Sequence, residues 1–468
     1  MPPGNATAVP LTRRANGDAI LVLGFAGLAC VLGGLGTRWP QESIAVAIGL
    51  LVISLMIFDL ALGVVIYVLA AFTFLGGKPN VATALTVLLA FGWVAGRSGQ
   101  VRLRPRPFRE VPLIAAVAAL FGAWVLIATL WAGDPAAAHG TAVRLTCDLL
   151  LLPIIYAAVR DERRLHWILL AIIVAGGVAA VTALVIPPSQ ASQYGTRAQG
   201  LIGDPNTLAA NMLPAVVLAP LLWMRGITGS QSGTRVLVLA CAAAGLAATI
   251  STGSRGAMLA LAAVLLLTPL VLGRWRRAAF TAITVGGAVG YVALGTLASP
   301  DAREHLGAST SSGRGDMWTI AQRMVRDHPL GGVGTGNFTH ESIHYLIRPG
   351  GYEDPGTTSR QLSEPLGVHN SYLQVWAEYG AVGLALYLML LTAAVACGIR
   401  AARIFRRLHQ EGLELAARGL VLAAGGLAVS IWFLTYIDYG RPVWVVLSLL
   451  VAVYGLALRM DRDTGRAR

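Results

Sequence analysis

Long apolar runs alternate with short polar segments along almost the whole chain. A helix needs about 20 apolar residues to cross a bilayer, with a range of roughly 17–25, and fourteen runs approach or reach that length. These runs are residues 19–36, 43–58, 59–75, 81–96, 111–132, 143–159, 167–186, 206–223, 235–250, 257–273, 278–298, 378–397, 418–436 and 443–459. The pattern predicts an all-α fold, a polytopic transmembrane helix bundle of about 12–14 spans, with the number of spans in 43–75 left open.

One long polar segment interrupts this pattern. Residues 299–369 lie between two apolar runs and contain five of the eight histidines. Long loops without secondary structure are uncommon, so short helices lying over the bundle are expected here. The stretch SGRGDMWTIAQRMVRDHP (312–329) predicts one such helix, and GGVGTGNF (331–338) predicts a tight turn.

Composition and charge agree with a membrane protein. Hydrophobic residues make up 56% of the 468 residues and charged residues only 13%, whereas a soluble protein carries about 25% charged residues. The net charge of +13 comes largely from short basic clusters between the apolar runs. We therefore interpret it as an orientation signal, and we expect the lipid bilayer, and no nucleic acid, as a partner.

The basic clusters determine the predicted orientation, because lysine and arginine in short loops favour the cytoplasmic side. With fourteen spans, both termini and all five clusters are cytoplasmic. The clusters are residues 97–109, 160–164, 274–277, 400–407 and 459–468. The sequence thus predicts a multi-pass protein of the cytoplasmic (inner) membrane, with the long polar segment on its periplasmic or extracytoplasmic side.

Four polar residues lie where predicted spans meet that outer side, and a fifth, Arg314, lies within the long polar segment. They are Arg255 in STGSRGAML, Arg314 in SSGRGDMW, His369 in GVHNSYLQ, and Arg197 and Asn206 in TRAQGLIGDPNTLAANM. Each also has a simpler interpretation: an interfacial anchor, a helix-surface charge, a loop histidine, or, for the asparagine, a helix cap. As a set, the guanidinium groups suit phosphate and the imidazole suits proton transfer. Together they indicate group transfer from a lipid diphosphate.

The same fragments, in the same order, carry a family resemblance. TRAQGLIGDPNTLAANM, STGSRGAML, SGRGDMW with AQRMVRDHPLGGVGTGNF, and GVHNSYLQVWAEYGAVGL resemble the O-antigen ligase and Wzy-type polymerase superfamily. The resemblance covers roughly residues 190–400, and it includes the large outer loop followed by three spans. The spans before residue 190 match only as generic hydrophobic helices.

The resemblance implies a role for each matching residue. Arg255 and Arg314 look like the arginines that hold undecaprenyl diphosphate, and His369 looks like the catalytic base that activates an acceptor hydroxyl. Arg197 and Asn206 match a further recurrent fragment and are candidates for substrate binding. The implied enzyme is a membrane glycosyltransferase that inverts the anomeric centre and needs neither a metal nor another cofactor. Its donor is an undecaprenyl-diphosphate-linked glycan, and its acceptor is a glycan, a lipid or a protein.

With this resemblance the chain divides into six segments. They are a cytoplasmic tail (1–18), N-terminal transmembrane helices (19–186), transmembrane helices of the ligase core (187–298), the large extracytoplasmic loop (299–369), C-terminal transmembrane helices (370–459) and a cytoplasmic tail (460–468).

Three alternatives stay open. A Wzy-type polysaccharide polymerase differs from a ligase only in its acceptor. A solute transporter would place charged residues near the membrane midplane and often uses repeated halves. The third is a zinc protease, because HESIH (340–344) has the H-E-x-x-H form, with Glu364 as a third ligand by spacing. The surroundings favour a short loop helix instead, although His340 and His344 could still bind a metal.

Overall fold

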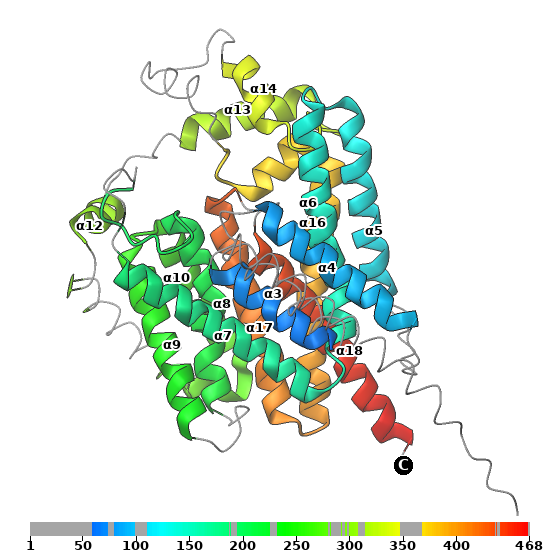
Figure 1. Ribbon diagram of the computed structural model, residues 1–468, viewed down its shortest axis with the longest axis vertical. Coiled ribbons are helices and arrows are strands. Elements are labelled where there is room, and N and C mark those ends of the chain that lie inside the picture. Colours follow the sequence, from blue (N-terminus) through cyan, green and yellow to red (C-terminus); the bar gives the residue numbers. More distant parts are fainter. Residues whose placement is uncertain are drawn as a thin grey trace, which may run out of the picture.

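The computed structural model describes a helical bundle (Figure 1). The described residues are 59–73, 79–98, 110–186, 194–224, 232–278, 299–307, 314–346, 367–435 and 440–466, with a few isolated positions between them. Throughout these ranges the regular secondary structure is helical, with no strand. The prediction of an all-α polytopic bundle is confirmed.

The helices follow one another in the order expected from the apolar runs. They are α3 (Leu60–Thr73), α4 (Pro79–Ser98), α5 (Pro112–Ile127), η2 (Ala128–Trp131), α6 (Pro135–Ala158), α7 (Glu162–Val185), α8 (Pro205–Met224), α9 (Ser232–Ser251), α10 (Arg255–Leu272), η3 (Gly273–Trp275), α12 (Pro300–Gly307), α13 (Arg314–Asp327), α14 (Phe338–Leu346), α16 (Ser371–Arg407), α17 (Glu411–Ser430), η4 (Ile431–Phe433) and α18 (Arg441–Arg466).

In the described part of the chain, nine helices are long and apolar enough to cross a membrane. They are based on α5 to α10 and on α16 to α18, and α3 and the apolar part of α4 are shorter. Each corresponds to a predicted span. The predicted spans at 19–36, 43–58 and 278–298 fall wholly or largely outside the described residues.

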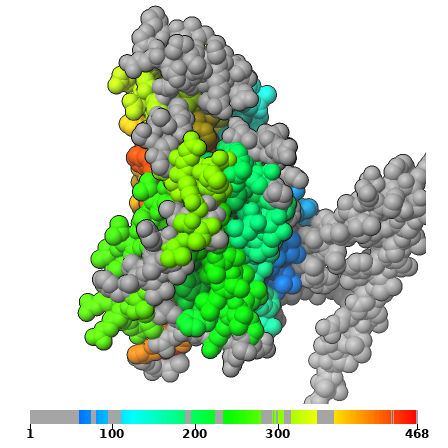
Figure 2. Space-filling model, turned by 90° about the vertical axis from the view of Figure 1, so that its left-hand side faces the viewer, coloured from blue at the N-terminus to red at the C-terminus, as the bar shows by residue number. Residues whose placement is uncertain are grey.

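Burial divides these helices into a centre and a periphery. The most hydrophobic windows of α17 and α18 are 72% and 78% buried, whereas those of α5 and α10 are only 28% buried. The outer surface of α10 accordingly carries exposed leucines such as Leu266 and Leu270. A helix that is apolar on all sides belongs inside a bundle, while exposed leucines at this depth suit contact with lipid. Figure 2 shows α9 on one such outer face.

Ion pairs join the basic clusters at one end of the bundle. Arg459 and Arg462, at the end of α18, pair with Glu110 before α5. Arg274, after α10, pairs with Glu414 near the start of α17. Arg407, at the end of α16, lies 4.0 Å from Asp461 of α18. These contacts agree with the expectation that the basic clusters share one face of the membrane.

The opposite end is covered by α13 and α14, which together we call the roof (Figure 1). Both predicted features of this region are confirmed: α13 is helical over Arg314–Asp327, and the following stretch turns through Gly332, Gly334 and Gly336, all with positive φ. The turn is buried against α16. The Val333 N–H donates to the Ala377 carbonyl at 2.8 Å, and the Gly334 N–H donates to the Glu378 carbonyl at 3.0 Å.

The turn fits because α16 is interrupted at Gly380. This residue has φ 66° and ψ −169°, a conformation that is essentially restricted to glycine. The Ala381 N–H then donates to the Pro329 carbonyl at 2.8 Å instead of continuing the helix. The glycine thereby allows the loop backbone to dock against the helix.

Gly380→Ala is expected to destabilise the protein severely. The backbone strain alone costs about 1–3 kcal/mol, and the added Cβ would collide with the carbonyl of Leu330. Thermal unfolding of the detergent-solubilised protein measures the loss. Gly233→Ala is the matched control, because nothing lies within 4 Å of its Cβ position. An unchanged unfolding midpoint for Gly380→Ala would contradict the proposed docking.

Candidate active site

Four of the five predicted site residues lie at or just before the start of a helix. Arg255 and Arg314 are the first residues of α10 and α13, and His369 lies two residues before α16. Asn206 is the second residue of α8, and Arg197 belongs to the segment before this helix. The start of a helix carries a partial positive charge and unpaired N–H groups. Such ends attract anions, phosphate included.

Arg197 connects two of these helix ends from a buried position. Its side chain is only 5% exposed, and its Nε donates to the Thr252 carbonyl at 2.7 Å. Its Nη2 donates to the amide oxygen of Asn206 at 3.3 Å. The guanidinium therefore ties the start of α8 to the turn between α9 and α10.

This geometry corrects the interpretation of Asn206 as a helix cap. The cap of α8 is Asp204, whose carboxylate accepts the Thr207 N–H at 2.6 Å. The side chain of Asn206 instead accepts a hydrogen bond from Arg197. A carboxylate at this position also interacts favourably with the helix dipole, which explains why the aspartate takes the role.

The turn before Arg255 is tightly packed. Gly253 has φ 61°, and the hydroxyl of Ser254 caps α10 by accepting the Ala257 N–H at 3.4 Å. Arg255 itself is half-buried. The next residue, Gly256, lies so close to η4 that an added Cβ would be 2.9 Å from the Cβ of Phe433. The start of α10 is therefore in contact with η4.

His369 approaches η4 from the other side. Its backbone N–H donates to Oγ1 of Thr435, two residues after η4, at 2.8 Å. Its φ is 49°, which is uncommon for a residue with a side chain and occurs often at functional sites. Asn370 caps α16 by accepting the Leu373 N–H at 3.0 Å, as its position in the sequence suggested. The strained backbone of His369 is thus held between a hydroxyl and a helix cap.

The roof contacts the same turn through α13. The indole N–H of Trp318 donates to the carbonyl of Val368, directly before His369, at 3.1 Å. Met317 and Met324 of α13 share an apolar cluster with Val368. Arg314 begins this helix one turn before Trp318, and its side chain lies outside the described residues.

Helix α12 forms hydrogen bonds to the segment that carries Arg197. The carboxylate of Asp301 accepts the Thr196 N–H at 2.7 Å and the Thr196 hydroxyl at 2.9 Å. These two hydrogen bonds lower the pKa of Asp301 below its ordinary value. The next residue, Ala302, packs against Gly253 in the turn before Arg255. Figure 1 shows α12 beside the upper end of α10.

Asp301→Asn is therefore expected to loosen the segment that carries Arg197 and to raise the KM for the donor substrate predicted from the sequence several-fold, with kcat less affected. Because the pKa is lowered in the folded protein, the stabilisation is present at neutral pH and is lost as the pH falls through that lowered pKa. Steady-state kinetics and unfolding at neutral and acidic pH would measure both effects. The exposed neighbour Glu304, replaced by glutamine, is the control.

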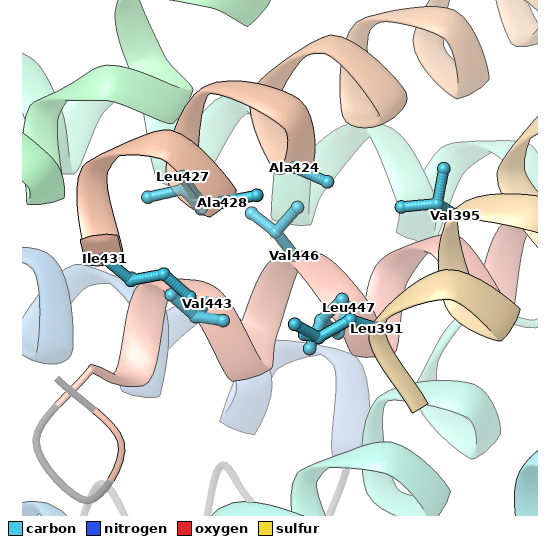
Figure 3. Close-up of a pocket in the computed structure, with 9 residues that line it drawn as sticks. All are labelled: Leu391, Val395, Ala424, Leu427, Ala428, Ile431, Val443, Val446 and Leu447. Atoms are coloured by element: carbon cyan, nitrogen blue, oxygen red, sulfur yellow. The ribbon is translucent and has the colours of Figure 1, made fainter. Parts of the chain in front are cut away.

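A small apolar pocket lies between α16, α17 and α18 (Figure 3). Its lining residues are Leu391, Val395, Ala424, Leu427, Ala428, Ile431, Val443, Val446 and Leu447. The lining offers no side chain that can bind phosphate or transfer a proton. The pocket can therefore receive only an apolar group, and none of the five candidate site residues is among its lining residues.

HESIH forms a short helix, as expected. It lies within α14, and the Nε2 of His340 is 3.9 Å from a carboxylate oxygen of Glu341. Glu364, the third zinc ligand by spacing, lies outside the described residues. His340, Glu341 and His344 thus form a cluster on α14.

The sequence does not single out η4 or Thr435. Thr435 lies at the end of the predicted span 418–436, and no local pattern distinguishes it from other polar residues near span ends. Its importance comes from a contact with His369, 66 residues earlier in the chain. Asp301 was missed for the same reason, since its partner Thr196 is 105 residues away.

Comparison with protein families gives a match for the central part of the chain. The family model for O-antigen ligase matches residues 237–388, a range that contains Arg255, Arg314 and His369. Arg197 and Asn206 precede it. No significant match was found among curated proteins. Residues 237–388 are thus similar to the O-antigen ligase family, as predicted from the three quoted fragments that lie in this range.

Proposed function

We propose that this chain transfers a glycan from undecaprenyl diphosphate to an acceptor hydroxyl on the outer face of the cytoplasmic membrane. The observation that carries the proposal is the position of η4. It contacts the start of α10 at Gly256, and the chain that follows it binds the backbone of His369 through Thr435. Candidate phosphate-binding and proton-accepting residues of the matched segment thus share one end of the bundle.

Arg255 and Arg314 bind the diphosphate in this proposal. A cation at the first position of a helix is unfavourable by itself, because the helix dipole is positive there. The arrangement becomes favourable when an anion is bound, since the guanidinium and the free N–H groups then act together. Arg197 and Asn206 hold the adjoining helix end in place and bind the donor on its flank.

His369 is the general base. Its imidazole removes the proton from the acceptor hydroxyl while that oxygen attacks the anomeric carbon of the donor. The bond from this carbon to the diphosphate oxygen breaks, and undecaprenyl diphosphate leaves with the electron pair. The arginines stabilise the charge that grows on the leaving group. This route assigns no step to a metal.

The polymerase alternative uses the same chemistry with a second lipid-linked glycan as acceptor. The choice between a glycan, a lipid and a protein acceptor depends on surfaces around the roof. Ligase and polymerase therefore share every role proposed above, and only the product distinguishes them.

One observation favours the transporter alternative. Arg441 at the start of α18 lies 3.7 Å from Asp148 of α6, and both side chains are only 2% exposed. Charged residues inside a membrane bundle often mark a solute or ion path. In the proposed enzyme this ion pair instead holds α6 and α18 together. Removal of one partner of a buried ion pair is strongly destabilising, so the pair has a structural role. Uptake of a solute by proteoliposomes that contain the protein but no donor glycan would favour the transporter alternative.

The decisive experiment measures release of undecaprenyl diphosphate from a lipid-linked oligosaccharide. Purified protein is reconstituted with a mixed acceptor extract, with and without EDTA, beside a His369→Asn variant. Release that survives EDTA and disappears in the variant supports the proposal. Release that EDTA abolishes both in the wild type and in a variant that lacks the imidazoles of His340 and His344 contradicts the metal-independent mechanism. Equal release by the His369→Asn variant contradicts the role of His369.

A further inference from the structure

The roof helix α14 has one buried and one exposed side. Phe338 and Tyr345 are each only 2% exposed and belong to the same apolar cluster as Val368, the neighbour of His369. His340 and His344 lie on the exposed side. Residues four apart in a helix are neighbours on its surface, so the two imidazoles stand next to each other above the protein.

Glu341 completes a set of three potential metal ligands. His340, Glu341 and His344 each offer one donor atom, and all three atoms lie within 4.8 Å of one another. Zinc binds nitrogen and oxygen donors at about 2.0–2.2 Å, which places the donors of a tetrahedral site about 3.4 Å apart. Binding of an ion therefore requires the donor atoms to approach from separations of at most 4.8 Å to about 3.4 Å.

Hydrogen bonds connect the start of α14, which carries the cluster, to Asp134 before α6. Asn337, at the start of α14, accepts the Asp134 N–H on its side-chain oxygen at 2.6 Å and donates its amide to the Asp134 carbonyl at 3.2 Å. Gly133, the residue before Asp134, lies next to the cluster, because an added Cβ would be 2.6 Å from Oε1 of Glu341. The glycine therefore leaves room for the carboxylate beside the start of α6.

We propose that His340, Glu341 and His344 bind one divalent transition-metal ion of the zinc type. Two imidazoles and one carboxylate match the donor preference of zinc, and three protein ligands leave one position for water. A nine-residue helix is too short to be stable alone. An ion that joins its successive turns stabilises α14, and thereby the roof beside Val368. The ion is structural and takes no part in glycan transfer.

Cobalt and zinc titrations of the intact protein test this site. The protein carries a non-histidine affinity tag and is freed of metal with EDTA. We expect one Co²⁺ per chain, with the visible absorption of a four-coordinate ion, displaced by one equivalent of Zn²⁺. His340→Ala and His344→Ala should each weaken Zn²⁺ binding by more than about tenfold, because even the loss of a residue behind a metal ligand costs 10–100-fold. His328→Ala, which removes an exposed imidazole of the same loop, should bind Zn²⁺ like the wild type.

A second measurement does not depend on variants that fold. Histidine modification of the wild-type protein, mapped by mass spectrometry with and without Zn²⁺, should show protection of His340 and His344 but not of His328. Zn²⁺ should also raise the thermal unfolding midpoint of the wild type and leave that of His344→Ala unchanged. Absence of a stoichiometric site at micromolar metal, or binding that persists in both alanine variants, would overturn the proposal.

Discussion

Replacement of His369 by asparagine is expected to lower glycan transfer by about 10²–10⁴-fold, because a positioned general base contributes that much to a rate. Asparagine is the informative substitution because the φ of 49° is tolerated by asparagine better than by most residues. The variant therefore keeps the backbone and the hydrogen bond to Thr435 while it removes the base. Release of undecaprenyl diphosphate under single-turnover conditions measures the effect on the chemical step.

Two controls separate chemistry from structure in this experiment. His369→Gly relieves the backbone strain entirely and should still be inactive, with a partial return of activity when free imidazole is added. His369→Ala combines loss of the base with strain, so its unfolding midpoint should be the lowest of the three variants. If either the asparagine or the glycine variant turned over at the wild-type rate, His369 would not be the base.

Replacement of Arg255 by alanine is expected to lower kcat/KM for the lipid donor by about 10–100-fold. Hydrogen bonds to charged groups contribute about 1.5–3 kcal/mol each, and every 1.4 kcal/mol corresponds to a factor of ten. Arg255→Lys should recover only part of this loss, because lysine keeps the charge but cannot donate the paired hydrogen bonds of a guanidinium. Arg314→Lys should behave in the same way. Donor titrations of the reconstituted protein measure the change.

Arg235 provides the matched control for Arg255. It is also an arginine near the start of a helix, in the first turn of α9, but it is exposed. Because α9 leads directly to the turn before α10, its start lies at the other end of the bundle. Arg235→Ala and Arg235→Lys should therefore leave donor affinity unchanged. An equal loss in the Arg235 and Arg255 variants would show that general basicity, not a defined diphosphate site, determines activity.

Local sequence alone determined the helical architecture. Every described helix that is long and apolar enough to span a membrane begins within about ten residues of a predicted span. This agreement has a simple reason: a bilayer requires each crossing segment to be apolar over its whole length and to satisfy its own backbone hydrogen bonds. The helix α13, the glycine turn after it and the cap at Asn370 were predictable because their signals also lie within a few neighbouring residues.

The sequence placed the candidate residues on loops but could not say which loops meet. Thr435 binds the backbone of His369 across 66 residues, and Arg197 binds the Thr252 carbonyl across 55 residues. Both partners are common residue types without a distinctive local pattern. The hydrogen bond of Asn206 to Arg197 likewise joins residues of two different segments, the loop before α8 and the helix itself.

Insertion of segments into the membrane and contacts between loops are therefore determined by different features of the chain. Hydropathy along the chain determines which segments enter the membrane and which loops stay outside, because burial in lipid is a property of each segment by itself. Contacts between loops depend on how the helices pack, and packing joins residues that are distant in sequence. The apolar runs determined the bundle. The contacts of Arg197 with Thr252, of the start of α10 with η4 and of His369 with Thr435 were decided only by the tertiary structure.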